Sequence, residues 1–168
     1  MITVVDIFAD IVTEVQKVYD PAGLEKPYFM PGSPNEIATI LSEKDASDEF
    51  KYKKYPTICL ILDTDEDHSV FSINCDNLVI AIITETQPHF EVEERRQSTF
   101  KNELYPIFEI LIEKIKTSKH LNMYRDQITF VKTDRFSWGR NRQIIMNDFV
   151  DGIEITRLKL IFSNECQL

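Results

Sequence analysis

The sequence VEERRQSTFKNELYPIFEILIEKIKTS, residues 92–118, is the longest stretch with a helical pattern in this chain of 168 residues. Its apolar residues recur at spacings of three and four, which places them on one helical face: Phe100, Leu104, Phe108, Leu111 and Ile115. Pro106 falls within the pattern and lacks a backbone N–H, so it predicts a kink or a split there. Two strand-like blocks precede this stretch and two follow it. We therefore expect an α+β fold in which a four-stranded, mainly antiparallel sheet packs against a long helix.

The strand-like blocks differ in their apolar pattern. Residues 57–62 and 77–84 are apolar at nearly every position, whereas a strand with one wet face alternates. Both faces of these strands must therefore be covered, either by the helices at 2–19 and 92–118 or by a subunit contact. Residues 127–133 alternate properly, and a shorter patch at 70–73 is also strand-like. The block 152–162 loses its apolar phase between Ile155 and Leu158, which predicts a β-bulge.

The N-terminal part combines helices with a proline-rich arm. An amphipathic helix is predicted over residues 2–19, and the arm at 21–34 follows it. The sequence SPNE at 33–36 predicts a capping box that begins a short helix. Tyr28, Phe29 and Met30 make the arm too apolar for a free linker, so they either pack on the chain's own core or dock on a neighbour. Residues 1–50 hold these helices and the arm, and residues 52–162 hold the sheet-and-helix core of a single domain spanning 1–168.

Composition and charge restrict the classes of function. The chain is 43% hydrophobic and 28% charged, which is typical of a globular domain, and its net charge is −9. A domain that grips DNA should be basic over its contact face, so stable nucleic-acid binding is not expected. An acidic surface can still lie beside DNA without holding it, although acidity for solubility alone explains the charge too.

No apolar run is long enough for a membrane helix, and no secretory signal pattern begins the chain. The three cysteines are far apart, as expected for reduced cytosolic thiols rather than a disulfide frame or a zinc site.

No catalytic motif of any strength is present. The acidic run at 63–68 lacks the glycine and glutamate of a calcium loop, and a two-carboxylate magnesium site has no further support. A metal-dependent nuclease core has an Asp on one strand and Glu-x-Lys on the next. Asp63 follows one predicted strand and Glu85 ends another, but no lysine stands two residues after Glu85. The sequence also lacks a nucleophile elbow and a glycine-rich phosphate loop. We therefore expect a chain that is not an enzyme and that uses no cofactor or metal, with 63–68 as a solvated turn.

An aromatic and basic cluster lies between the last two strand-like blocks. Phe136 and Trp138 stand beside Arg140 and Arg142, a composition typical of protein–protein anchors. The alternative is that Trp138 packs on its own core while the arginines balance the surplus acid. We favour the interface.

Several of these stretches together resemble small proteins from the structural gene modules of tailed phages. The stretches are 55–63, 78–86 with 93–96, 100–111, Trp138 with Gly139, and 147–155, and the similarity covers about residues 52–162. The family is the head–tail junction group of tail terminators, tail-completion proteins and neck ring proteins. The resemblance implies a structural virion protein, assembled in the bacterial host cytoplasm, that forms a six-fold or twelve-fold ring around the DNA channel. Portal, neck or tail proteins would be its neighbours, and DNA would pass without specific binding.

The resemblance also gives roles to the residues singled out above. The subunit-interface candidates are Tyr28, Phe29, Met30, Phe136, Trp138, Arg140 and Arg142. The acidic candidates for the channel wall are Asp63, Asp65, Glu66 and Asp67. A rival hypothesis is a monomeric, acidic, cytosolic protein-binding module of the inhibitor or immunity type, which would plug a basic partner. A ring predicts a large oligomer, and the rival predicts a stable monomer that forms a one-to-one complex.

Overall fold

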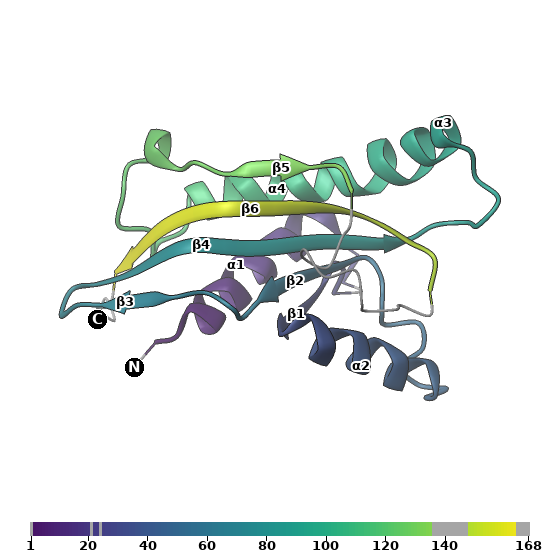
Figure 1. Cartoon of the computed structure of the whole chain (residues 1–168), viewed down its shortest axis with the longest axis horizontal. Coiled ribbons are helices and arrows are strands. Elements are labelled where there is room, and N and C mark those ends of the chain that lie inside the picture. The colour runs from purple at the N-terminus through teal and green to yellow at the C-terminus, as the bar shows by residue number, and fades with distance from the viewer. Residues whose placement is uncertain (1, 21, 24, 136–147, 164–168) are drawn as a thin grey trace.

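The structure is a computed structural model that describes residues 2–20, 22–23, 25–135 and 148–163. The N-terminal half contains α1 (Val4–Tyr19), β1 (Tyr28–Gly32), α2 (Pro34–Asp45), β2 (Thr57–Ile61), β3 (Glu66–His68) and β4 (Ser72–Glu85). The C-terminal half contains α3 (Val92–Arg95), the π-helix η1 (Arg96–Leu104), α4 (Tyr105–Lys116), the 3-10 helix η2 (Arg125–Gln127), β5 (Val131–Thr133) and β6 (Val150–Ser163). Figure 1 shows one long sheet with the helices packed on it.

The α+β class is confirmed, but the sheet has six strands rather than four. Its order is β1-β2-β4-β6-β5, and β3 pairs with β4 outside this path. The β1–β2 pair is parallel and the other pairs are antiparallel, so the sheet is mixed. The two missed strands were short: β1 lies within the proline-rich arm, and β3 is three exposed residues. Strand β1 is as long as β2 but contains Pro31 and Gly32, which are unfavourable in strands, and β3 is too short to show alternation.

Both faces of the apolar strands are covered inside the subunit. Helices α1 and α4 pack together on one face, against β-strand residues such as Leu60, Ile82 and Leu160. Helix α2 covers part of the other face, where Ile37 and Leu41 join a second cluster. Of the two covers considered for these strands, the helices at 2–19 and 92–118 cover only one face, and the second face is covered by α2. Because α2 supplies the second cover, the fully buried β2 does not require a subunit contact.

The long helix changes its hydrogen-bond register before Pro106. Nine residues form the π-helix η1, and the Tyr105 N–H donates to the Phe100 carbonyl five residues earlier. Helix α4 then carries Pro106 in its first turn, where a missing N–H costs least. The predicted kink or split is thus a switch from π-helix to α-helix.

The SPNE capping box is confirmed, since Ser33 and Glu36 cap the start of α2 reciprocally.

The β4–β6 ribbon contains two bulges that compensate for each other. The pairing slips by one residue around Asn77 on β4 and again around Arg157 on β6, and both residues have positive φ angles, 62° and 55°. The second slip confirms the bulge predicted between Ile155 and Leu158. Beyond it the ribbon bends and continues as a projection that also includes β3 (Figure 1).

Candidate subunit-contact site

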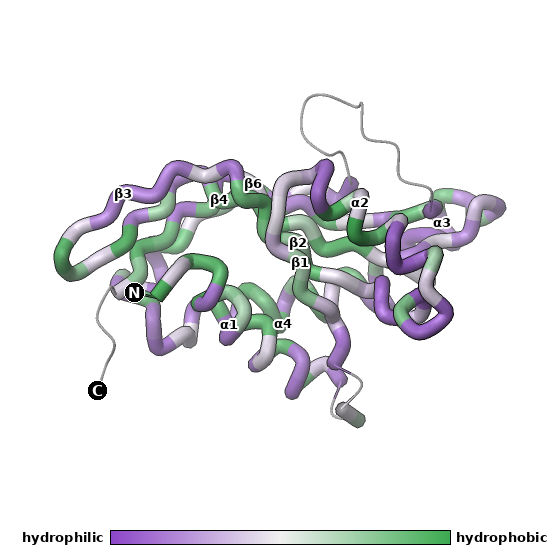
Figure 2. The backbone as a smooth tube through the Cα atoms, turned by 90° about the horizontal axis from the view of Figure 1, so that it is seen from below, coloured by the Kyte–Doolittle hydropathy of each residue, from purple (hydrophilic) through white to green (hydrophobic). Residues whose placement is uncertain are grey.

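A projecting hairpin carries apolar side chains at its tip. We call residues 62–76, which include β3 and the start of β4, the hairpin arm. Its turn is closed by the Ser69 N–H, which donates to the Ser72 carbonyl at 2.8 Å. Val70 and Phe71 occupy the turn with 78% and 66% of their surface exposed. Figure 2 shows this apolar tip at the end of the hairpin. Turns normally carry Gly, Pro, Asn, Asp or Ser, so two large apolar residues here indicate a contact surface.

The hairpin arm is also strongly acidic. Asp63, Asp65, Glu66 and Asp67 are all exposed, as a solvated run requires, but Glu66 and Asp67 lie in strand β3 rather than in the predicted turn. Glu66 lies 2.8 Å from His68, while no described residue forms an ion pair or hydrogen bond with the Asp63, Asp65 or Asp67 carboxylates. Across the described part of the chain, no three His, Cys, Asp or Glu side chains are grouped as a metal site would require. The arm therefore presents free negative charge around an apolar tip.

An aromatic and basic surface lies near the opposite end of the sheet. We call residues 50–53 the aromatic–lysine patch. Phe50 and Tyr52 are 43% and 75% exposed. The Lys51 ammonium lies 5.2 Å from the Tyr52 ring centroid, and the Lys53 ammonium lies 6.0 Å from the Phe50 centroid. A hollow of about 200 Å³ adjoins the patch and is lined by Asp45, Lys51, Tyr52, Lys54, Tyr55, Glu85 and Asp148.

A buried lysine anchors this patch to the sheet. The Lys54 side chain is 6% exposed and forms ion pairs with Asp45, at 2.5 Å, and with Asp148. The Tyr55 hydroxyl donates to Asp148 at 2.8 Å. Burial lowers the pKa of the Lys54 ammonium, but its hydrogen bonds to Asp148 and Asp45 outweigh burial and hold that pKa above its usual value. Lys54 thereby joins the end of α2, the entry to β2 and the entry to β6.

A hollow of about 470 Å³ lies between α3, η1 and β6. Arg95 lines it and holds the buried Asp151 carboxylate through two hydrogen bonds, one of them at 3.0 Å from Nε. Arg96 is paired with Glu93 in the same way, at 2.9 and 3.0 Å. Both guanidinium groups are therefore engaged: Arg95 fixes the long helix on β6, and Arg96 makes a local pair within the helical stretch.

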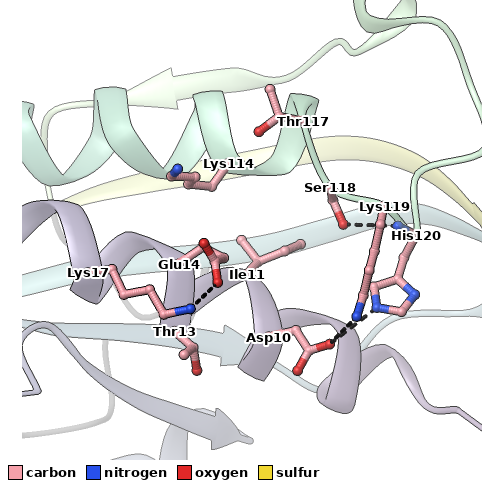
Figure 3. Close-up of a pocket in the computed structure, with 10 residues that line it drawn as sticks. All are labelled: Asp10, Ile11, Thr13, Glu14, Lys17, Lys114, Thr117, Ser118, Lys119 and His120. Atoms are coloured by element: carbon pink, nitrogen blue, oxygen red, sulfur yellow. Dashed lines mark hydrogen bonds and ion pairs between the residues drawn. The ribbon is translucent and has the colours of Figure 1, made fainter.

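A polar groove of about 530 Å³ separates α1 from the end of α4 (Figure 3). Asp10 points across it toward His120, at 3.2 Å, and Lys119, at 3.7 Å. On the α1 side, Lys17 pairs with Glu14 at 2.5 Å. The groove contains both signs of charge in close pairs, so it ties the segment after α4 to α1.

The structure places the first group of interface candidates in a strand. Tyr28, Phe29 and Met30 lie in β1, which pairs in parallel with β2 at one edge of the sheet. Met30 is 4% exposed and belongs to the α2-side core, so it is removed from the list of contact residues. Phe29 packs partly against the main core, and the Lys44 ammonium lies 5.5 Å from the Tyr28 ring centroid. This segment was expected either to pack on the chain's own core or to dock on a neighbour, and Met30 packs on the core.

The second group lies outside the described residues. Phe136, Trp138, Arg140 and Arg142 fall in the segment 136–147 between β5 and β6.

Sequence reasoning missed the apolar tip at Val70, because a strand-like patch was the simpler interpretation of residues 70–73. The signal that could have found it is the pair of large apolar residues between Ser69 and Ser72.

Comparisons with known proteins add no family to this picture. No protein-family model matches the chain. No curated protein matches it either. The resemblance to head–tail junction proteins therefore stays a prediction. Among the described helices, none is long and apolar enough to cross a membrane.

Proposed function

We propose that this chain is a structural, non-enzymatic subunit of the head–tail junction of a tailed phage, and that its copies close into a ring around the DNA channel. The observation that carries the proposal is the hairpin arm, which projects from a well-covered core and exposes Val70 and Phe71 at its tip. Exposed apolar surface of this kind marks a protein contact. The chain's own helices cover both faces of the apolar strands, so these strands need no contact with another subunit. The hairpin arm is therefore the expected subunit contact instead.

The acidic charge supports a place beside DNA rather than on it. The net charge is −9, and the arm adds exposed carboxylates at Asp63, Asp65, Glu66 and Asp67. A wall of like charge keeps a polyanion away from its surface, so DNA can slide without sticking. In this proposal the chain belongs to the virion, is assembled in the host cytoplasm, and touches portal, neck or tail proteins above and below its ring.

The mass of the protein in solution tests the proposal. We expect light scattering and native mass spectrometry to give six or twelve copies of the 19.7 kDa chain, and electron micrographs to show rings with a central hole. A chain that remains monomeric at every accessible concentration would contradict the ring. Trp138→Ala should then impair assembly more than it lowers the melting temperature of the monomer; the reverse result would assign Trp138 to the core.

The second candidate function is an acidic module that binds a basic protein. The unpaired carboxylates of the hairpin arm favour it, because they form an exposed negative surface without internal partners among the described residues. This hypothesis predicts a stable monomer and a one-to-one complex that weakens steeply with salt. The same mass measurement separates it from the ring.

A further inference from the structure

We infer that the tip of the hairpin arm in one copy docks on the aromatic–lysine patch of the next copy. This inference rests on the proposed ring and names the surfaces that would close it. The tip supplies Val70 and Phe71, flanked by the arm carboxylates, and the patch supplies Phe50 and Tyr52 beneath the Lys53 and Lys51 ammonium groups. The occupant of the patch is therefore a second copy of this chain.

The positions of the two surfaces favour a contact between copies. Strand β4 begins at Ser72, beside the tip, and ends at Glu85, which lines the hollow next to Tyr52. Its 14 residues span about 45 Å at roughly 3.3 Å per residue, so a tip cannot reach the patch of its own subunit. Each copy thus has one donor surface and one acceptor surface at opposite ends of the sheet (Figure 1). Contacts between unlike surfaces are heterologous, and they generate a ring when the rotation closes.

The chemistry of the two surfaces is complementary. An aromatic ring packs well against other aromatic rings at its edge or face, which suits Phe71 against Tyr52. The carboxylates of Asp65 and Asp67 lie close to the tip in sequence and have no partner among the described residues, whereas Lys51 and Lys53 are exposed. Lys51 pairs with Asp48 at 3.1 Å, and that carboxylate is fully exposed, so the pair is weak and an incoming carboxylate can replace it.

Disulfide cross-linking between two variants tests the contact directly. One variant carries Val70→Cys and the other carries Phe50→Cys, so that Phe71 and Tyr52 stay in place, and both carry Cys166→Ser to remove a thiol outside the described residues. Cys59 and Cys75 are buried and stay in place. We expect a cross-linked dimer when the two variants are mixed under mild oxidation, and loss of that product when either variant is used alone. A chain with both substitutions should give a ladder of covalent oligomers.

A matched control replaces Phe50→Cys with Val131→Cys, because Val131 is 44% exposed and Phe50 is 43% exposed. The mixture of Val70→Cys with Val131→Cys should give no cross-linked dimer. If the wild-type chain forms rings but the Val70→Cys and Phe50→Cys mixture does not cross-link, the inference is wrong and the ring proposal stands. If the chain is monomeric at all concentrations and no cross-link forms, both are wrong.

Discussion

Replacing Lys54 with methionine should destabilise the fold far more than replacing a neighbouring exposed lysine. The Lys54 ammonium is buried between Asp45 and Asp148, and the latter lies 94 residues away in sequence. Lys54→Met keeps an unbranched apolar side chain of similar reach but removes the charge. Two carboxylates then lose their cation, and Asp148 keeps the Tyr55 hydroxyl as a hydrogen-bond donor.

The size of the effect follows from the burial of the three charged groups. Breaking a buried ion pair by removing one partner costs about 3–5 kcal/mol. Here Asp148 is 21% and Asp45 is 43% exposed, so water solvates part of the charge left behind. We therefore expect a loss of about 2–3 kcal/mol in the free energy of unfolding. For a chain of this size, that loss lowers the melting temperature by about 4–12 °C.

Urea denaturation of Lys54→Met, Asp148→Asn and the double variant measures this coupling. The double variant leaves no unpaired charge at Asp148, so it should recover about 1–2 kcal/mol relative to the sum of the single losses. Lys51→Met is the control, because Lys51 pairs with a fully exposed Asp48, and its effect should stay below about 0.5 kcal/mol. Equal losses for Lys54→Met and Lys51→Met, or strict additivity in the cycle, would refute the reasoning.

Three further predictions concern the tip, the buried thiols and one surface carboxylate. Phe71→Ser should leave the melting temperature of the monomer unchanged but raise the concentration for half-assembly by up to about 250-fold in a light-scattering dilution series. This value comes from burying roughly two-thirds of a side chain of about 200 Å² at about 25 cal/mol per Å². Burial raises the pKa of the Cys59 and Cys75 thiols to about 12, so neither should react with an alkylating reagent at pH 8 until urea unfolds the chain, as mass spectrometry would show. Hydrogen bonds, chiefly from Arg96, lower the pKa of the Glu93 carboxyl from 4.5 to about 2. The ionised Glu93 therefore contributes fully to stability above pH 4.5, and this contribution is lost as the pH falls toward 2. An NMR titration of Glu93 with a midpoint near 4.5 would contradict this prediction.

The local features of the fold could be predicted from the sequence because neighbouring residues determine them. The Ser33–Glu36 capping box, the break at Pro106 and the bulge after Ile155 each depend on a few adjacent residues. Their partners lie within one turn or one strand pair, so composition and spacing carry the signal. The α+β class followed from the same local patterns.

The arrangement of the layers could not be predicted in this way. Helices α1 and α4 share one face of the sheet, and the short helix α2, with Ile37 and Leu41 as its buried residues, covers part of the other. A helical pattern shows which side of a helix is apolar but not which face of a sheet it meets. The same limit applies to Lys54, whose burial depends on Asp148 across 94 residues. In the candidate site, the exposed acidic run was predicted from its composition, whereas the exposure of Val70 depends on how far the β4–β6 ribbon extends beyond α1.

The covered sheet moves the case for a ring from the strands to the hairpin arm. A strand with two apolar faces needs a cover, and the subunit supplies one for β2 on each side. The tip has no such cover in the described structure, since Val70 and Phe71 remain mostly exposed. A hairpin that only extended the sheet would be served better by a polar turn, because exposed apolar side chains there add nothing to the stability of the isolated chain. The two bulges at Asn77 and Arg157 also set the arm apart from the rigid core. An extension of this kind, with apolar residues at its end and free carboxylates behind them, is suited to reaching a neighbouring molecule.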